Sequence, residues 1–352
     1  MVIVRERPKI LTTSERLIEA NMKKRLDESV LMPGDIIFTT SNALLSKKVR
    51  IATKSDISHS MIYVSHCSVI HAVGEGVRGQ NTQSIIFDPD SPVYVKRLKQ
   101  GLHQDTATRI CDYVRNIVGS EYSVKEALKA GMGVGDKFSS KQFCSRLIAQ
   151  AYHRFGYELV DNQNYCTPAD LLWSEMLAEI AQPTKDVSDD EARFWEEENN
   201  DADIAQSAMD RVLTCIRAID PSVQTLNDIG RFVIRYPEHD SFVASSFEQS
   251  GYLDLWDHDL KEHPWRYDLQ QMEREQSQPG VLAYCLGTMR AEPRDDNRFT
   301  KSLAGYQISN ASCPRETFRR LIGLYTKLAD LHARRIDTAR QWLRKYPPAL
   351  QP

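Results

Sequence analysis

The sequence predicts an α+β protein, in which a domain of helices around a central antiparallel sheet precedes a mainly α-helical domain. Strand patterns rich in Val, Ile, Tyr and Phe gather between residues 35 and 98. Apolar residues at helical spacing follow them. After residue 180 the chain becomes acidic and the strand patterns stop. With 352 residues the chain is long enough for two domains, which we place at residues 1–182 and 183–352.

The composition excludes several classes of protein. Hydrophobic residues make up 41% of the chain and charged residues 26%, as in soluble globular proteins. A net charge of −3 gives no sign of a nucleic-acid-binding surface. No apolar run approaches the ~18 residues of a transmembrane segment. Two early arginines without a following apolar core do not form a secretory signal peptide. We therefore expect a cytoplasmic protein, or one exported without a signal peptide.

The cysteines indicate free thiols rather than a disulfide framework or a metal centre. They are odd in number, scattered, and lack a CxxC pair or zinc-finger spacing. His258 and His263 are five residues apart and share no helix face, so we expect no metal there. No organic cofactor is expected either. The seven positions are Cys67, Cys111, Cys144, Cys166, Cys215, Cys285 and Cys313.

The strands of the first domain lie between two groups of helices. A break at Met32-Pro33-Gly34 separates an N-terminal helix from a buried strand. A hairpin crosses Ser65-His66-Cys67, and a turn follows at Asp88-Pro89-Asp90. The predicted elements are a helix over 13–28, strands over 35–40, 58–64, 68–73, 84–87 and 93–98, a helix over 104–118 and a helix from Cys144 to Gly156.

Helices account for most of the second domain. Ser188 and Glu191 fit a capping box, so a helix begins near residue 189. Further helices are predicted over 203–218, within 222–236 and over 315–345, with loops and short helices over 237–300. The polar face of the last helix is rich in arginine, which fits a solvated face or contact with an anionic partner. The helical domain is also a candidate surface for a protein partner.

Cys144 is the first candidate for chemistry, because it begins an amphipathic helix after a polar, glycine-rich loop. The dipole and the free N–H groups at a helix N-terminus favour negative charge, so a thiol there ionises more easily. Its own N–H can also face a developing oxyanion. The alternative is a small buried core residue, which is the common role of a free cysteine. We interpret Cys144 as a nucleophile.

Two histidines on paired strands are the natural partners of such a thiol. His59 begins the strand SHSMIYV, and His71 lies in the next strand, VIHAV. Either one alone fits an inert, hydrogen-bonded histidine. Together they fit a base and the residue that orients it. They share one sheet face only if the hairpin loop has an odd number of residues or the ladder contains a bulge.

Six segments in this order resemble a known family. They are PGDIIF, SHSMIYV, VIHAVGEGV, VGSEYS, FCSRLIAQAYHRFG and TPADLLWS, which together span about residues 31–176. The order is similar to that of the circularly permuted NlpC-type papain-like cysteine hydrolases, the branch of the YiiX/YebB-like proteins and lecithin–retinol acyltransferase. In that branch the histidine strand precedes the cysteine helix.

The resemblance implies roles for particular residues. Cys144 corresponds to the nucleophile, His59 to the base and His71 to the third polar position. Glu75 is an alternative orienting residue, although it lies four residues beyond the matching position. Tyr122, in VGSEYS, matches an aromatic residue close to the site, and a core role fits it equally. The family pattern leaves residues 183–352 unexplained.

We therefore expect a cysteine hydrolase or acyltransferase that works through an acyl-thioenzyme. His59 would take the proton of Cys144, or hold it already as an imidazolium–thiolate pair. The substrate would contain an amide, thioester or ester bond, in a peptide, peptidoglycan or acyl-lipid. The alternative is a non-catalytic binding or scaffold protein on a papain-like fold, with the helical domain mediating the interaction.

Overall fold

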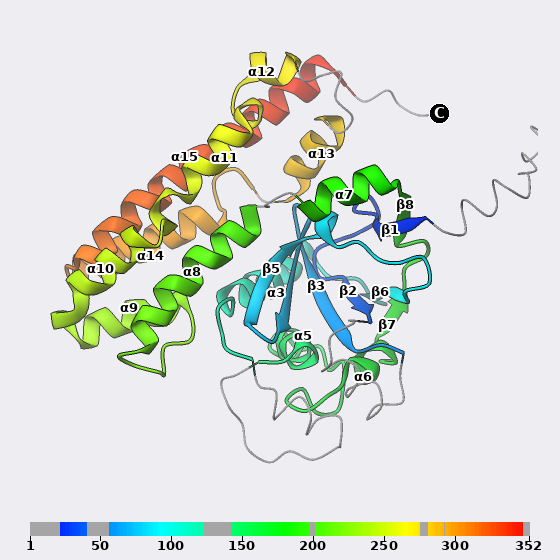
Figure 1. Cartoon of the computed structure of the whole chain (residues 1–352), viewed down its shortest axis with the longest axis horizontal. Helices are drawn as coiled ribbons and strands as arrows, with labels where there is room; N and C mark the ends of the chain where they lie inside the picture. Colours follow the sequence, from blue (N-terminus) through cyan, green and yellow to red (C-terminus); the bar gives the residue numbers. More distant parts are fainter. Residues whose placement is uncertain are drawn as a thin grey trace, which may run out of the picture.

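The computed structural model describes residues 22–40, 56–122, 142–197, 201–274, 281–291 and 293–347. Its first half is built on a six-stranded sheet in the order β5-β4-β3-β2-β6-β7, with every neighbouring pair antiparallel (Figure 1). The second half is helical, so the α+β class is confirmed. The strands of this sheet are β2 (Ile36–Thr39), β3 (His59–Ser65), β4 (Ser68–Val73), β5 (Gly76–Asn81), β6 (Val93–Leu98) and β7 (Leu177–Glu179).

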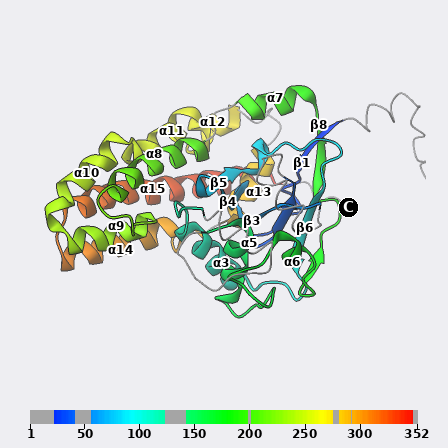
Figure 2. The ribbon, with the colours of Figure 1, turned by 60° about the horizontal axis from the view of Figure 1, so that its bottom comes forward.

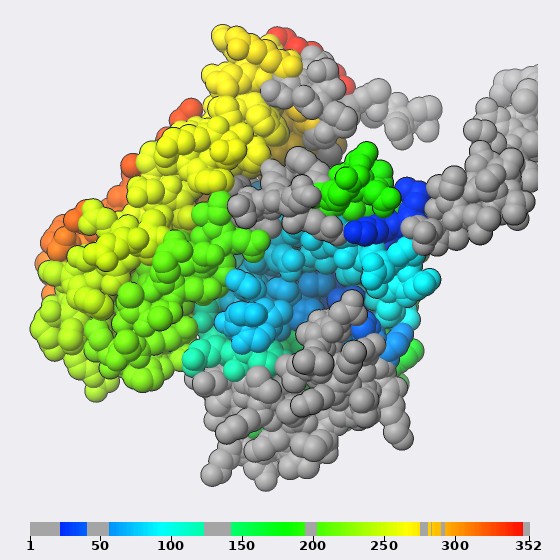
Figure 3. Space-filling model, in the orientation of Figure 1, coloured from blue at the N-terminus to red at the C-terminus, as the bar shows by residue number. Residues whose placement is uncertain are grey.

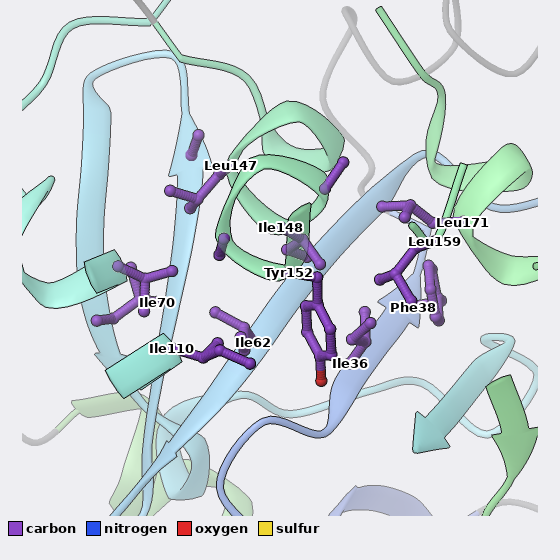
Figure 4. Packing of buried hydrophobic residues seen from close by; sticks show 14 of the residues in the cluster. Ile36, Phe38, Ile62, Ile70, Ile110, Leu147, Ile148, Tyr152, Leu159 and Leu171 are labelled. Atoms are coloured by element: carbon purple, nitrogen blue, oxygen red, sulfur yellow. The ribbon is translucent and has the colours of Figure 1, made fainter. Parts of the chain in front are cut away.

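The sheet buries both of its faces. One face carries Ile62 and Ile70. Three helices pack on it: α3 (Gln104–Asn116), α5 (Cys144–His153) and α6 (Pro168–Leu172). Figure 4 shows Leu147 and Ile148 of α5 against these strand residues. A second apolar cluster, which includes Ile37, Met61, Tyr63 and Val95, covers the opposite face. Alternate strand residues therefore enter two different cores, as the two-residue period of a strand requires.

The predicted N-terminal helix over 13–28 is wrong where the structure describes it. Lys23–Leu26 is not helical but forms β1, which pairs with β8 (Thr184–Val187). The fully buried Leu26 joins the second apolar cluster, and this tertiary contact outweighs the local helical spacing. The rest of the predicted helix, residues 13–21, lies outside the described residues.

The predicted strand over 84–87 is also wrong. Thr82–Ser84 forms a short 3-10 helix, η1, because the side chain of Asn81 accepts a hydrogen bond from the N–H of Gln83. Phe87 alone makes a bridge, to Lys24. Strands β5, β7 and β8 were also not predicted from the sequence, and the GVRGQN sequence of β5 has two glycines and no alternation of apolar residues.

A buried ion pair fixes the entry into β2. Asp35 is 1% exposed and accepts two hydrogen bonds from Arg97 of β6, each 2.7 Å long. The same carboxylate accepts the N–H of Met32 at 2.8 Å. Because Arg97 also donates to the carbonyl of Val30, the loop before β2 is tied to β6. Asp35 is thus structural, as its turn position indicated.

The helical half contains one long helix, α15 (Glu316–Lys345), against which several others pack. Figure 2 shows these helices as an elongated layer beside the sheet. No helix in the described part of the chain is both long and apolar enough to cross a membrane. The other elements of this half are α7 (Asp189–Glu197), α8 (Asp201–Arg217), α9 (Leu226–Arg235), η2 (Pro237–His239), α10 (Asp240–Gln249), η3 (Tyr252–Asp254), α11 (Leu255–Glu262), η4 (Pro264–Arg266), α12 (Leu269–Arg274), α13 (Val281–Ala291) and α14 (Arg298–Ser312).

The two halves contact each other along α8, which lies beside β5 (Figure 3). Arg217 of α8 donates to the carbonyl of Gly119 at 2.6 Å and to that of Gln224 at 2.7 Å. Gly119 has φ +97°, and a side chain there would collide with Leu213 of α8. A domain boundary after residue 182 stays a prediction. Beyond that residue, β8 still pairs with β1 of the first half.

We expect Asp35→Ala to lower the free energy of unfolding by about 3 kcal/mol, because it leaves the Arg97 guanidinium without its buried counter-ion. Urea denaturation of the full chain measures this loss. Asp90→Ala is the matched control, since Asp90 is exposed, and should change stability by less than about 0.5 kcal/mol. An equal loss in both variants would contradict the role given to the ion pair.

Candidate active site

Helix α5 places Cys144 at its first residue. Phe143 is the N-cap residue, and no side chain caps the N–H groups that follow it. These N–H groups have no partner within the helix, because the first turn of any helix lacks acceptors for them. Those of Cys144 and Ser145 face the sulfur. The predicted position of the thiol at a helix N-terminus is therefore present in the structure.

Contacts on both sides hold the start of α5. The Ser145 hydroxyl donates to the carbonyl of Cys166 at 2.6 Å. Arg146 is fully buried, donates to the carbonyl of Asn164 at 2.8 Å and lies over the ring of Phe143 at 4.4 Å. Since Cys144 lies between these anchored residues, its Cα position is fixed by the packing of the loop before α6.

The β3–β4 hairpin brings His59 and His71 to one face of the sheet. Ser65 pairs with Ser68, so the turn itself is His66-Cys67, with φ values of 48° and 50°. The ladder contains an irregularity between Tyr63 and Ser65. The two histidines can share a face only with an odd loop or a bulge. The structure has a bulge and a two-residue turn, and not a three-residue loop.

The two imidazoles are hydrogen-bonded to each other. His59 Nε2 lies 2.9 Å from His71 Nδ1, and the rings meet edge to face at 66°. If His59 is to accept a proton at Nδ1, its Nε2 must carry hydrogen and donate to His71. His71 then carries hydrogen on Nε2, a buried atom without a hydrogen-bond partner among the described residues. The pair is therefore able to hold His59 in the tautomer of a base.

The thiol lies against the peptide bond that joins His59 to Ser60. The N–H of Ser60 is directed at the Cys144 sulfur, and its hydroxyl is close enough to act on it. This hydroxyl makes no hydrogen bond of ordinary geometry within the described part of the chain. The backbone of His59 is thus one peptide unit from the sulfur. Sequence analysis missed Ser60, whose only signal was a small polar residue between His59 and the apolar stretch that follows.

Burial sets the protonation state of this group. Burial lowers the pKa of His59 to about 4, and it lowers the pKa of His71 as well, with the charge of His59 acting in the same direction. Burial raises the pKa of the Cys144 thiol, and the N–H and hydroxyl groups of Ser60 offset part of that effect. Of the two states that the sequence left open, a neutral thiol and a resting ion pair, burial favours the neutral thiol, because desolvation outweighs the helix dipole.

The two remaining candidates lie in different places. Tyr122 pairs with Gln142 through the backbone, two residues before Cys144. Burial raises its pKa, and the nearby Cys144 adds to this, so Tyr122 lies close to the thiol. Glu75 is exposed in the turn after β4 and lines a cavity of about 260 Å³ with His71 and Asp203. The ring of His59 is oriented by His71 and not by Glu75.

No group of three or more His, Cys, Asp or Glu side chains with metal-binding geometry occurs among the residues described. The described contacts join His59 to His71, and Ser60 to the Cys144 sulfur. Covalent acyl transfer needs a nucleophile, a base and an orienting group, and the assignment of these roles to Cys144, His59 and His71 stays a prediction.

Comparison with protein families gives one match. Residues 30–181 match the model described as "Permuted papain-like amidase enzyme, YaeF/YiiX, C92 family". The matched segment contains every candidate site residue, together with β2 to β7 and α5. Its first residue precedes the Asp35 turn, and its last follows β7.

Individual proteins resemble the same part of the chain. The "Probable lipoprotein peptidase YaeF" of Escherichia coli (strain K12) is 25% identical over 183 residues, covering 42% of this chain and 65% of that protein. The chain therefore spans slightly less than two thirds of the length of this curated relative. The crystal structure of "metalloprotein yiiX" from Escherichia coli O157:H7 matches with 19% identity and a TM-score of 0.34, covering 43% of this chain and 97% of that one.

The depressed pKa of His59 predicts how stability depends on pH. The unfolded chain binds a proton at His59 near its ordinary pKa of 6.5, whereas the folded chain binds it only near 4. Stability is thus complete above pH 6.5 and falls as the pH drops toward 4. His59→Gln should reduce the slope of unfolding free energy against pH between about 5 and 6.5 by up to about 1.4 kcal/mol per pH unit.

Urea denaturation at a series of pH values tests this, with His103→Gln as the control. The His103 side chain is 79% exposed, so its removal should leave the slope unchanged. Equal slopes for wild type and His59→Gln would mean that His59 titrates alike in both states.

Proposed function

We propose that this protein is a cysteine hydrolase that cleaves amide, ester or thioester bonds through an acyl-thioenzyme, because residues 30–181 match the model of the permuted papain-like YaeF/YiiX family. The observation that carries the proposal is a thiol at an uncapped helix N-terminus that lies against Ser60, the residue next to His59 of the hydrogen-bonded pair His59–His71. A core cysteine needs neither the paired imidazoles nor the free N–H groups.

The neutral resting pair supports a general-base mechanism. As the thiol approaches a carbonyl carbon, its proton passes to His59 Nδ1, and the sulfur forms the new bond to carbon. The imidazolium so formed is stabilised because its Nε2–H donates to His71 Nδ1. The N–H of Cys144 faces the oxygen that becomes negative, and this stabilises the tetrahedral intermediate.

Three proton transfers complete the cycle. His59 gives its proton to the leaving amine, alcohol or thiol as the carbon bond to that group breaks. A water molecule then attacks the thioester, loses its proton to His59 and releases a carboxylic acid. Cys144 recovers its proton from His59. An acceptor other than water would make the same site an acyltransferase.

The substrate class remains wide in this proposal. The matched family is described as amidases, and the curated relative is named a probable lipoprotein peptidase. Both names point to an acyl-nitrogen bond. A peptide-like or acylated amide is therefore the first substrate to test, with esters and thioesters of the same acyl group alongside it.

Cys144→Ala should abolish turnover, because the acyl-enzyme forms on the Cys144 sulfur. Cys111→Ala is the matched control, since Cys111 is 1% exposed in the same half of the chain. It should retain full turnover. Mass spectrometry after incubation with amide, ester and thioester substrates detects the acyl adduct on Cys144 and identifies the acyl group. Adduct formation that survives Cys144→Ala would overturn the proposal in favour of another nucleophile or a binding protein.

His71→Ala should lower kcat by about 10- to 100-fold, the cost of losing one charge-assisted hydrogen bond to the imidazolium. KM should change little, because His71 touches His59 and not the substrate. His71→Asn restores an acceptor oxygen near the position of Nδ1 and should recover part of the loss. Equal kcat values for His71→Ala and wild type would remove His71 from the mechanism.

A further inference from the structure

Ser60 is a buried polar residue to which the proposed reaction gives no role. Its side chain is fully buried, and its Oγ lacks a hydrogen-bond partner among the described residues. A buried hydroxyl without a partner is unfavourable, so such groups are rare in folded proteins. Because Ser60 follows His59 in β3 and lies against the Cys144 sulfur, this hydroxyl belongs to the candidate active site.

The pairing of β3 with β4 ends close to Ser60. The last pair of this ladder is Ile62–Ile70, although β3 begins at His59 and β4 continues to Val73. Both strands are described over their whole length, and no pair follows this one. The two strands therefore separate before Ser60 can meet a partner in β4.

This separation leaves the N–H of Ser60 outside the ladder. The N–H of Tyr63 donates to the carbonyl of Asp35, on the side of β2. Backbone groups of successive strand residues point to opposite sides, so the N–H of Ser60, three residues earlier, points toward β4. Since β4 has already separated from β3 at this point, the N–H is available to another acceptor.

The sulfur of Cys144 is that acceptor. Helix α5, which begins at Cys144, contacts both β3 and β4. The N–H and the hydroxyl of Ser60 act on the sulfur together with the N–H groups of Cys144 and Ser145. Four donors from β3 and α5 thus surround one sulfur atom. Hydrogen bonds to an ionised acceptor are stronger than those to a neutral one, so this arrangement stabilises negative charge on the sulfur.

Hydrogen bonds, rather than neighbouring charges, oppose the effect of burial on this thiol. Tyr122 and Cys166 are titratable groups that feel the charge of Cys144. Burial raises the pKa of both, to about 12 for Cys166, so both are neutral at pH 7. The guanidinium of Arg146 lies over the ring of Phe143. The pKa of Cys144 is set by burial, which raises it, and by the surrounding donors, which lower it.

We propose that Ser60 is a further catalytic residue, whose hydroxyl and N–H hold the negative charge of the Cys144 sulfur while the thiol proton is on His59. This role rests on the acyl-thioenzyme function proposed for the site. The proton leaves the sulfur for His59 Nδ1, and Ser60 keeps its own proton and donates a hydrogen bond to the sulfur. As the sulfur bonds to the carbonyl carbon, the negative charge moves to the carbonyl oxygen. Ser60 therefore stabilises the charge-separated state that precedes this bond.

Alkylation of Cys144 by iodoacetamide as a function of pH measures the thiol pKa in the full-length protein, with mass spectrometry of the Cys144 peptide as the readout. Ser60→Ala should raise this pKa by about one unit and slow alkylation at pH 7 about tenfold, because a hydrogen bond to a charged group has roughly this effect. Ser60→Thr keeps the hydroxyl and should be alkylated nearly as fast as wild type.

Ser246→Ala is the matched control. Ser246 is a buried serine of the helical half, and its hydroxyl donates to the carbonyl of Phe242 within α10. This variant should be alkylated at Cys144 as wild type is. A variant that fails to fold would expose the thiol and speed its alkylation, which is the opposite of the result expected for Ser60→Ala.

Two results would overturn the role of Ser60. An equal thiol pKa in Ser60→Ala and wild type would show that the hydroxyl does not act on the sulfur. An equal rise of the thiol pKa in Ser60→Ala and Ser60→Thr would show that the size of the side chain matters and the hydroxyl does not. A gain in stability of Ser60→Ala in urea, with unchanged alkylation, would identify Ser60 as a hydroxyl buried without function.

The inference and the proposed hydrolase can fail separately, because the alkylation experiment needs no substrate. If Cys144→Ala retains turnover while Ser60→Ala raises the thiol pKa, the hydrolase proposal fails and the hydrogen bond of Ser60 to the sulfur stands. If Cys144→Ala abolishes turnover, Ser60→Ala should lower kcat/KM at pH 7, and the loss should shrink as the pH rises toward the thiol pKa. An unchanged thiol pKa and kcat/KM in Ser60→Ala would then refute the role of Ser60 alone.

Discussion

The packing of α5 on the central sheet is the constraint on which the rest of the site depends. Leu147, Ile148 and Tyr152 are fully buried against β2, β3 and β4 (Figure 4), and the Tyr152 hydroxyl donates to the carbonyl of Gly34 at 2.5 Å. This contact reaches the same turn that the Asp35–Arg97 ion pair holds. Because the helix cannot shift along its axis without opening this core, the sulfur of Cys144 stays against the peptide of Ser60.

The same packing that positions the thiol also keeps it neutral. Burial favours the uncharged forms of both the thiol and His59, so charges separate only when a substrate contributes its own polar groups. The uncapped N–H groups of α5 are then available to the oxyanion. In a site of this kind the resting thiol is less reactive, and the surrounding groups stabilise the charge that develops during the reaction.

The β3–β4 hairpin joins the two halves of the molecule physically. His59 and His71 belong to the sheet, whereas His66 at the hairpin turn lies in the field of Arg335 and Arg298 from the helical half. Contacts of α8 with β5 and the hydrogen bonds of Arg217 to the chain around Gly119 hold the two halves together.

The sequence by itself determined the order of the main strands and helices, the start of α5 at Cys144 and the pairing of the two histidine strands, because these follow from local periodicity and turn chemistry. It predicted a helix where β1 lies, since only burial of Leu26 under the sheet and pairing with β8 reveal a strand there. It indicated a thiol that ionises easily and left its resting state open, because a helix N-terminus can be recognised in a sequence and the depth of burial cannot. The tertiary structure alone decided the protonation of the site and the place of Ser60, since each depends on contacts between residues far apart in the chain.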